Sequence, residues 1–360
     1  MHVNNTNILN SLRNEIDKQL LGLINNDFVL LNLPYYENIG DVLIWEGELE
    51  YFKKIPYKCK FSTGINDIGY IKGNIEEGDV IIIQGGGNFG TEYRNLQLFF
   101  NDVVKAFPRN RIIIFPETVY YDNYYLLKQD AKIFSEHKDL YLCVRDNYSK
   151  NLLTRFNFCK NILLVPDMAF YINPLSLSKD LLNPEDAVLF AKRLDKEFAK
   201  NNIYNINEPP QTIIEELDWP TYYEQCAIVL EMKKILANQS SDVINSFFFN
   251  RFRLELISLG VRFLSKYKKV YTTRLHVFIL CVILGIPVEV FDNTYGKNRH
   301  FFETWFGKLK SDSISYVQCG IKMRFSQWTR DFKALIKLIF HYQTKWDGMK
   351  KTNYLFGREF

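Results

Sequence analysis

The sequence predicts an α/β protein built from two Rossmann-like domains. Three observations lead to this fold class. Short runs rich in Ile, Val and Leu alternate with segments of helical periodicity along most of the chain. The length of 360 residues corresponds to about two domains of ordinary size. A stretch rich in Ser, Pro and Asn at residues 173–183 interrupts the alternation, as a linker between domains would.

The first domain is expected to span residues 1–172. Its predicted strands are the apolar runs at residues 27–33, 79–84, 111–115, 140–144 and 162–165. Helices are expected to follow these runs, the first ending near residue 52 and the others covering about 93–106, 124–137 and 148–155. Apolar strands separated by helices are typical of a parallel sheet that is covered on both faces. Right-handed crossovers then bring all the strand exits to one edge of the sheet.

The second domain is expected to span residues 184–324, with a polar loop or insertion at 201–210. Its predicted strands lie at 187–190, 269–271 and 288–291, and its predicted helices lie at 222–237, 250–267 and 277–284. The helix at 277–284 should end at Gly285, just before Pro287. The tail, residues 325–360, contains an amphipathic helix at 327–342 that could pack back on the first domain. Ligands of open α/β sheets bind beyond the carboxyl ends of the strands, so a site is expected in the cleft between the two domains.

The composition excludes several classes of protein. The net charge is only +4 and the two signs are interspersed, which argues against a nucleic-acid partner. The six cysteines are scattered without a C-x-x-C pair, as in proteins of a reducing cytoplasm. Residues 1–20 lack the apolar core of a signal peptide, and no apolar run reaches the roughly 20 residues that span a bilayer. We therefore expect a cytoplasmic protein, for which contact with the inner face of the membrane stays open.

The segment Thr272–His276 points most directly to a ligand site. It follows a predicted strand and opens an apolar helix, so Arg274 and His276 stand at a strand exit. Arginine binds anions through its planar fork, and an imidazole can act as acid or base near pH 7. A turn lets both residues face one ligand, whereas residues two apart inside a regular helix point in different directions. The segment predicts an anion site, while a structural role is the commoner one for a lone His.

Two segments with glycines follow strands of the first domain. After the first strand, a Gly at position 40 would let backbone N–H groups approach an anion at a helix N-terminus, and the Asp beside it has the alternative role of helix cap. After the second strand comes a Gly-rich loop that lacks the motifs of phosphate-binding and dinucleotide-binding loops. It is either a tight turn in a crowded cleft or a backbone contact with substrate. The candidate substrate contacts in these segments are Asn38, Gly40, Asp41, Gly86, Gly87 and Asn88.

Three more charged residues stand at strand exits of the first domain. Arg145 offers a fork for paired carboxylate or phosphate oxygens, and the alternative is a surface ion pair with Asp146 or Asp41. Glu117 would contact the acceptor or act as a base. Asp167 is expected to help close the cleft.

In the second domain, Asn293 and Lys297 follow the last predicted strand. Lys297 would neutralise a phosphate, and Asn293 is either a ligand contact or the helix cap of a solvated turn. No cluster with the spacing of metal ligands is visible, so neither a metal nor another cofactor is expected.

Taken together, these motifs resemble the polysaccharide pyruvyl transferase family over about residues 27–305. The resemblance is carried by the following segments in this order: Asn38–Asp41, Gly85–Asn88, Val144–Asp146 with Ser149, Pro166–Asp167, Thr273–His276 and Gly296–Lys297. It implies a two-domain fold of glycosyltransferase-B-like form with the active site in the interdomain cleft. It also implies transfer of pyruvate from phosphoenolpyruvate to a sugar, usually as a cyclic ketal, with Arg145, Arg274, Leu275 and His276 around the phosphoenolpyruvate.

The chemistry agrees with these residues. Phosphoenolpyruvate carries a carboxylate and a phosphate, which two arginines can clamp. His276 is expected to be the general acid or to assist departure of the phosphate. The acceptor would be a sugar of a surface polysaccharide, such as a capsule or exopolysaccharide, or of its lipid-linked precursor.

Two other functions remain open from the sequence. A nucleotide-sugar-dependent glycosyltransferase of the same two-domain shape would also set Arg and Lys against phosphates. A non-catalytic glycan-binding protein on this scaffold would tolerate loss of His276 but would need aromatic side chains in the cleft.

Overall fold

The computed structural model of the protein describes residues 3–64, 68–223, 225–237, 246–309, 311–321, 354–355 and 358–359. The chain divides into two compact units. The larger unit comprises Met1–Phe198 and Ile206–Gln318, and the smaller comprises Ala199–Asn205 and Cys319–Phe360. Both large sheets belong to the larger unit. The predicted domain boundaries near residues 172 and 184 stay a prediction.

The smaller unit contains short antiparallel pairs in its described parts. Strand β9 (Asn202–Ile203) pairs with β14 (Gly320–Ile321), and β15 (Tyr354–Leu355) pairs with β16 (Arg358–Glu359). The helix predicted at 327–342 lies outside the described residues.

The first sheet is parallel, as the sequence predicts, and its strand order is β2-β1-β3-β5-β6-β7, with β4 added beside β5. Its strands are β1 (Phe28–Leu31), β2 (Cys59–Ser62), β3 (Val80–Ile83), β4 (Gly86–Gly90), β5 (Ile112–Tyr120), β6 (Leu140–Val144) and β7 (Asn161–Leu164). The helices of this part are α1 (Val3–Leu20), α2 (Ile39–Phe52), α3 (Ile68–Lys72), α4 (Arg94–Ala106), α5 (Tyr124–Ser135) and α6 (Asn147–Arg155). The five predicted strands are all present. The predicted Gly-rich loop is instead a strand, β4, because its backbone pairs with β5.

The second sheet is also parallel in its described strands, in the order β10-β8-β11-β12-β13. These are β8 (Glu185–Ala191), β10 (Ile213–Leu217), β11 (Tyr267–Thr272), β12 (Val288–Val290) and β13 (Ile314–Tyr316). The helices are α7 (Ala227–Ala237), α8 (Ser246–Ser265), α9 (Leu275–Leu284) and α10 (Lys297–Trp305), with short 3₁₀ helices η1 (Met168–Tyr171), η2 (Pro174–Asp180) and η3 (Pro220–Tyr222) along the chain. Helix α9 ends at Gly285 in the left-handed conformation, as predicted (φ 74°).

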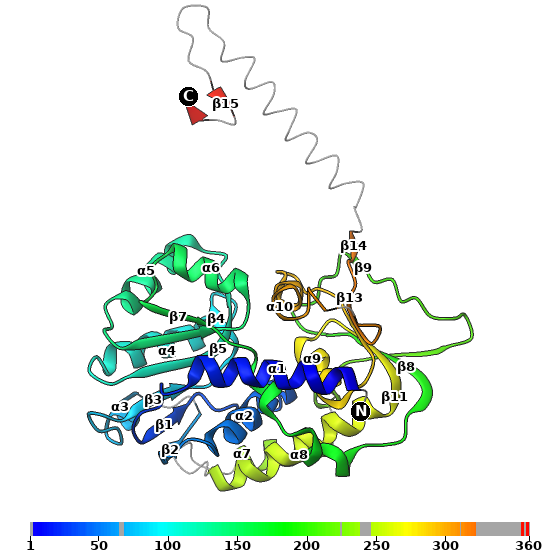
Figure 1. Ribbon diagram of the computed structural model, residues 1–360, viewed down its shortest axis with the longest axis horizontal. Helices are drawn as coiled ribbons and strands as arrows, with labels where there is room; N and C mark the ends of the chain where they lie inside the picture. The colour runs from blue at the N-terminus through cyan, green and yellow to red at the C-terminus, as the bar shows by residue number, and fades with distance from the viewer. Residues whose placement is uncertain are drawn as a thin grey trace, which may run out of the picture. The chain divides into compact units, whose positions relative to one another are not determined.

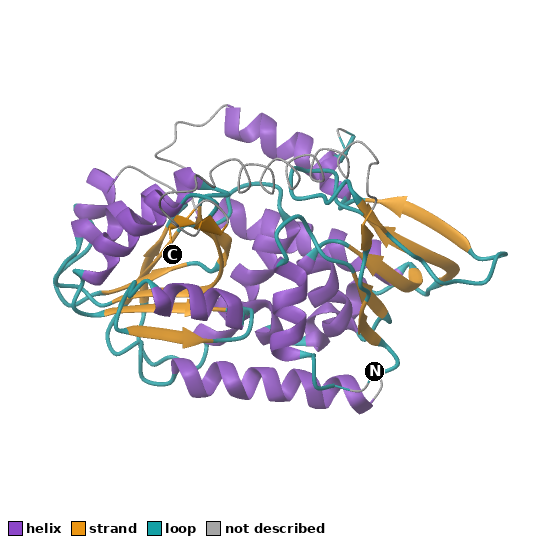
Figure 2. Cartoon of the chain, turned by 90° about the horizontal axis from the view of Figure 1, so that it is seen from above, coloured by secondary structure: helices purple, strands orange, loops and turns teal. Residues whose placement is uncertain are grey.

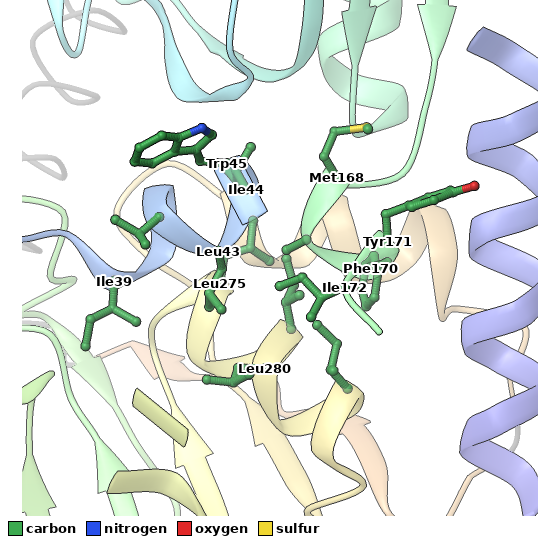
Figure 3. Close-up of a cluster of buried hydrophobic side chains, with 14 of the residues drawn as sticks. Ile39, Leu43, Ile44, Trp45, Met168, Phe170, Tyr171, Ile172, Leu275 and Leu280 are labelled. Atoms are coloured by element: carbon green, nitrogen blue, oxygen red, sulfur yellow. The ribbon is translucent and has the colours of Figure 1, made fainter. Parts of the chain in front are cut away.

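Helices lie between the two sheets, as Figures 1 and 2 show. Their apolar side chains form one buried cluster that α2, η1 and α9 share (Figure 3). Leu43 of α2, Phe170 of η1 and Leu280 of α9 belong to this cluster, and all three are fully buried. The cluster holds the first residues of α2 and α9, which carry predicted site motifs, in one packed body.

The strand orders indicate where a ligand should bind. In the first sheet the order reverses between β1 and β3, and in the second it reverses between β8 and β11. Ligands of open α/β sheets bind beyond the strand ends at such switch points. The segments that leave these four strands are therefore the expected site.

Candidate active site

A pocket of about 530 Å³ lies at these switch points, within the usual range for ligand sites. Its lining comes from segments that follow strands of both sheets: 36–41, 87–88, 193–197 and 274–276. Lys297 and residues 219–223 complete much of the wall. Asn38, Asp41, Gly87, Asn88, Arg274, Leu275, His276 and Lys297, all predicted from the sequence, line the pocket. Gly40, Gly86, Glu117, Arg145, Asp167 and Asn293 lie among or behind them and do not line it.

His276 meets Arg145 and Asp167 across the two sheets. The Nε2 atom of His276 lies 3.4 Å from Asp167 Oδ2 and 3.5 Å from Arg145 Nη1. Arg145 donates to Asp167 over 2.5 Å, and both side chains are buried. Burial by itself would raise the pKa of Asp167, but His276 and Arg145 outweigh it and the pKa falls well below its usual value. The alternative of a surface ion pair between Arg145 and Asp146 or Asp41 is therefore wrong.

The start of α2 shapes the pocket beside His276. Asn38 caps the helix by accepting a hydrogen bond from the Gly40 N–H at 2.9 Å, so the alternative of Asp41 as the cap is wrong. Asp41 instead accepts hydrogen bonds from Tyr36 and Asn38, each at 2.8 Å. Gly40 faces His276, and a Cβ at position 40 would clash with Nδ1 of the imidazole. The glycine is needed because the histidine ring occupies the space of a side chain.

Two cationic groups converge on Gly87. A Cβ at this position would lie 2.6 Å from Lys297 Nζ and 3.2 Å from Arg145 Nη2. Arg145 Nη2 is buried and has no hydrogen-bond partner among the described residues, whereas Nε donates to Thr118. Burial lowers the pKa of Lys297, and the nearby Arg145 lowers it further. An unpartnered buried guanidinium nitrogen beside a buried ammonium group is suited to bind an anion.

Glu117 is on β5, next to the Gly-rich strand β4. Its Oε2 accepts a hydrogen bond from the Asn88 N–H at 2.9 Å, and its Oε1 is buried near Gly86 with no partner among the described residues. Complete burial raises the pKa of Glu117 to about 8, although Asn88 and Arg145 counteract part of the rise. Glu117 is therefore mostly protonated at neutral pH.

Arg274 contacts carboxylates. Its Nε and Nη2 donate to Asp218, and Nη2 also lies 3.1 Å from Asp195. Its guanidinium carbon lies 4.4 Å from the centroid of the Tyr222 ring. A contact between Arg274 and phosphoenolpyruvate stays a prediction, and Nη1 is the nitrogen that these contacts leave for it.

Glu197 is a central residue that the sequence reasoning missed. It is buried after β8 and forms ion pairs with Arg193 at 2.8 Å and Lys297 at 3.6 Å. It also accepts hydrogen bonds from Asn293 at 2.9 Å and from Tyr295 at 3.1 Å. Asn293 is itself buried, and its side-chain oxygen accepts a hydrogen bond from the Lys297 N–H. The alternative of a solvated turn is therefore wrong. The sequence signal that could have identified Glu197 is its position after a strand. Charged residues follow β8 and β10, just as the predicted site residues follow other strands: Arg193, Asp195, Glu197 and Asp218.

Comparison with known proteins identifies the family. The model of the family described as polysaccharide pyruvyl transferase matches residues 38–295. This chain belongs to that family. The site residues discussed above lie within the matched range, apart from Tyr36 and Lys297, which lie just outside it.

Individual relatives agree with this assignment. The chain is 29% identical over 315 residues to "Putative pyruvyl transferase EpsO" of Bacillus subtilis (strain 168), covering 83% of this chain and 93% of the relative. It is 27% identical to "Pyruvyl transferase 1" of Schizosaccharomyces pombe (strain 972 / ATCC 24843), covering 80% and 72%. The protein is thus a pyruvyl transferase of polysaccharide biosynthesis, and the acceptor class is a polysaccharide.

The fold also has a relative among solved structures. A crystal structure of a functionally uncharacterised protein from Klebsiella pneumoniae subsp. pneumoniae NTUH-K2044 matches with a TM-score of 0.55 and 21% identity, over 85% of this chain and 98% of that one. Within the described residues, no helix has the length and apolar character needed to cross a membrane.

Proposed function

We propose that this pyruvyl transferase takes pyruvate from phosphoenolpyruvate and attaches it to a sugar of a surface polysaccharide, or of its lipid-linked precursor, as a ketal. The observation that carries the proposal is the convergence of Arg145 Nη2 and Lys297 Nζ on Gly87, with His276 next to Arg145. The donor has two anionic groups, and two buried cationic groups stand at this corner: Lys297 in the pocket wall and Arg145 directly behind it.

The reaction needs a proton, an anion clamp and two sugar hydroxyls. A proton adds to C3 of the enol, and one sugar hydroxyl adds to C2, which then bears the methyl group. The bond between C2 and the phosphate oxygen breaks, phosphate leaves, and the second hydroxyl closes the ketal. One hydroxyl proton replaces the proton given to C3, and the other leaves with phosphate, so the atoms balance.

The proposed roles follow from position. Arg145 and Lys297 hold the anion, and Arg274 contributes through Nη1. His276 either protonates C3 or assists phosphate departure, because it lines the pocket next to Arg145 of the proposed clamp. Leu275 lines the wall beside them. The reaction requires no metal or other cofactor in this scheme.

The architecture belongs to the same proposal. We place the pocket in the cleft of a glycosyltransferase-B-like pair of Rossmann-like domains, since it lies at the switch points of two parallel sheets. The scattered cysteines support a cytoplasmic location, and a lipid-linked acceptor would bring the enzyme to the inner face of the membrane.

The test is release of inorganic phosphate from phosphoenolpyruvate by the purified chain, measured with simple and lipid-linked glycosides and followed by mass analysis of the product. We expect phosphate release that depends on both substrates, and a product heavier than the acceptor by the mass of a pyruvate ketal. Release of a nucleoside diphosphate from a sugar nucleotide, without turnover of phosphoenolpyruvate, would instead favour a glycosyltransferase.

A further inference from the structure

The wall of the pocket formed by residues 219–223 is aromatic and open. Tyr222 and Tyr223 line the pocket with 42% and 39% of their surfaces exposed, and Tyr36 lines it with 38% exposed. Large aromatic side chains that stay exposed inside a pocket supply contact area for a ligand at a low cost in conformational entropy.

These rings are held in place from behind. Asp218 is fully buried and accepts hydrogen bonds from Arg274, whose guanidinium group stacks on Tyr222. The backbone N–H of Asp218 donates to the Tyr223 hydroxyl at 2.9 Å. The Tyr36 hydroxyl donates to Asp41 at 2.8 Å. A cation–π contact fixes the Tyr222 ring, and hydrogen bonds fix Tyr223 and Tyr36, before any ligand arrives, which reduces the cost of binding.

We propose that Tyr36, Tyr222 and Tyr223 form the acceptor subsite and take one neutral hexopyranose ring by its apolar C–H face. The assignment rests on the proposed function and adds to it the residues and ligand class of the second substrate. The carboxylates of Asp41 and Asp195 line the same pocket and can accept hydrogen bonds from sugar hydroxyls.

Two features of the pocket decide the class of sugar. The nearby arginines are paired, Arg274 with Asp218 and Arg193 with Asp195, and the carboxylates of Asp41 and Asp195 line the same pocket, so a neutral sugar is favoured over a uronic acid. The whole pocket has a volume of about 530 Å³, which leaves room for only one small ligand beside the donor. A single terminal sugar enters, and the rest of the glycan stays outside.

The test measures glycoside binding to the full chain without donor, by calorimetry and saturation-transfer NMR. The probes are the methyl glycosides of galactose, mannose and glucose, with methyl glucuronide as the anionic comparison. We expect at least one neutral glycoside to bind more tightly than the glucuronide. Tyr222→Ala and Tyr223→Ala should each weaken this binding by about 10-fold or more, and Tyr222→Phe by no more than about 3-fold, because it keeps the ring.

A matched control is Tyr125→Ala. Tyr125 is 68% exposed on α5 and does not line the pocket, so this variant should bind like the wild type. Circular dichroism checks that every variant is folded. Wild-type binding by Tyr222→Ala and Tyr223→Ala, tighter binding of the glucuronide, or no glycoside binding at all would each overturn the subsite.

Kinetics separates this proposal from the proposed function. If phosphoenolpyruvate is turned over, Tyr223→Ala should raise KM for the acceptor and leave KM for phosphoenolpyruvate within about 2-fold. Absence of phosphoenolpyruvate turnover in the wild type would overturn the donor assignment, while the glycoside titration would still decide the tyrosine subsite.

Discussion

At the scale of single residues, the contact between Gly40 and His276 makes a direct prediction. A methyl group at position 40 would overlap the imidazole, so Gly40→Ala should displace the ring from Asp167. We expect kcat to fall by about 10²-fold or more, as it does on loss of a positioned acid. Circular dichroism and phosphate release at saturating substrate measure the effect.

The control is the double variant. In a His276→Ala background the ring is gone, so Gly40→Ala should cost little more than His276→Ala does alone. Full additivity of the two effects would mean that Gly40 acts on something other than the histidine.

Glu117 makes a prediction about pH. Its folded-state pKa is about 8, above its ordinary value of 4.5. Between these values the folded chain keeps a proton that the unfolded chain releases, so this group's contribution to stability declines as pH rises and is lost above about pH 8. The side chain of the Glu117→Gln variant cannot ionise. Between pH 4 and pH 9, the free energy of unfolding of the wild type should therefore fall by about 2–5 kcal/mol relative to that of the variant.

Urea unfolding at both pH values measures this difference, and other titrating groups cancel in the comparison. Glu303→Gln, at an exposed position, is the matched control and should run parallel to wild type. If Glu117→Gln also runs parallel, the buried carboxyl is already ionised at neutral pH.

At the scale of elements, the packing of α2 on η1 depends on Gly47. A Cβ at position 47 would overlap the backbone carbonyl of Met168, which cannot move as a side-chain tip can. Gly47→Ala should therefore destabilise the fold by about 3 kcal/mol or more, at the upper end for overpacking. Glu50→Ala, on the same helix, should change the free energy of unfolding by less than about 1 kcal/mol. Equal urea midpoints for the two variants would contradict the close packing.

The elements also show which patterns could be predicted from sequence. The strands of the first sheet stand out because β1, β3 and the first four residues of β5 are continuous apolar runs buried on both faces. Strand β4 does not stand out in the sequence, because Gly86–Gly90 has low strand propensity. It forms a strand only through pairing with β5. Helix α1 was missed although Leu9, Leu12 and Ile16 recur at helical spacing and are buried.

At the scale of the whole molecule, the sequence predicted the site through strand exits. Arg145, Asp167 and His276 are far apart in the chain, and the topology of two parallel sheets brings them together. The partners were harder to predict, because Arg274 could equally have faced a substrate, and only the packed structure places Asp218 against it. Pairing between distant segments is a tertiary property that local pattern does not encode.

The last prediction concerns donor binding and the stability of the larger unit. Pocket residues come from both sheets, so phosphoenolpyruvate should stabilise them together by about 2.7 kcal/mol at 100 times Kd. This corresponds to a rise of a few °C in Tm. Lys297→Met removes one buried cation of the proposed clamp and should reduce that rise by at least half.

Lys233→Met is the matched control, since Lys233 lines the same pocket but is exposed on α7, and it should keep the full rise. Thermal unfolding with and without phosphoenolpyruvate measures the shift, and equal shifts in the two variants would exclude Lys297 from the donor site.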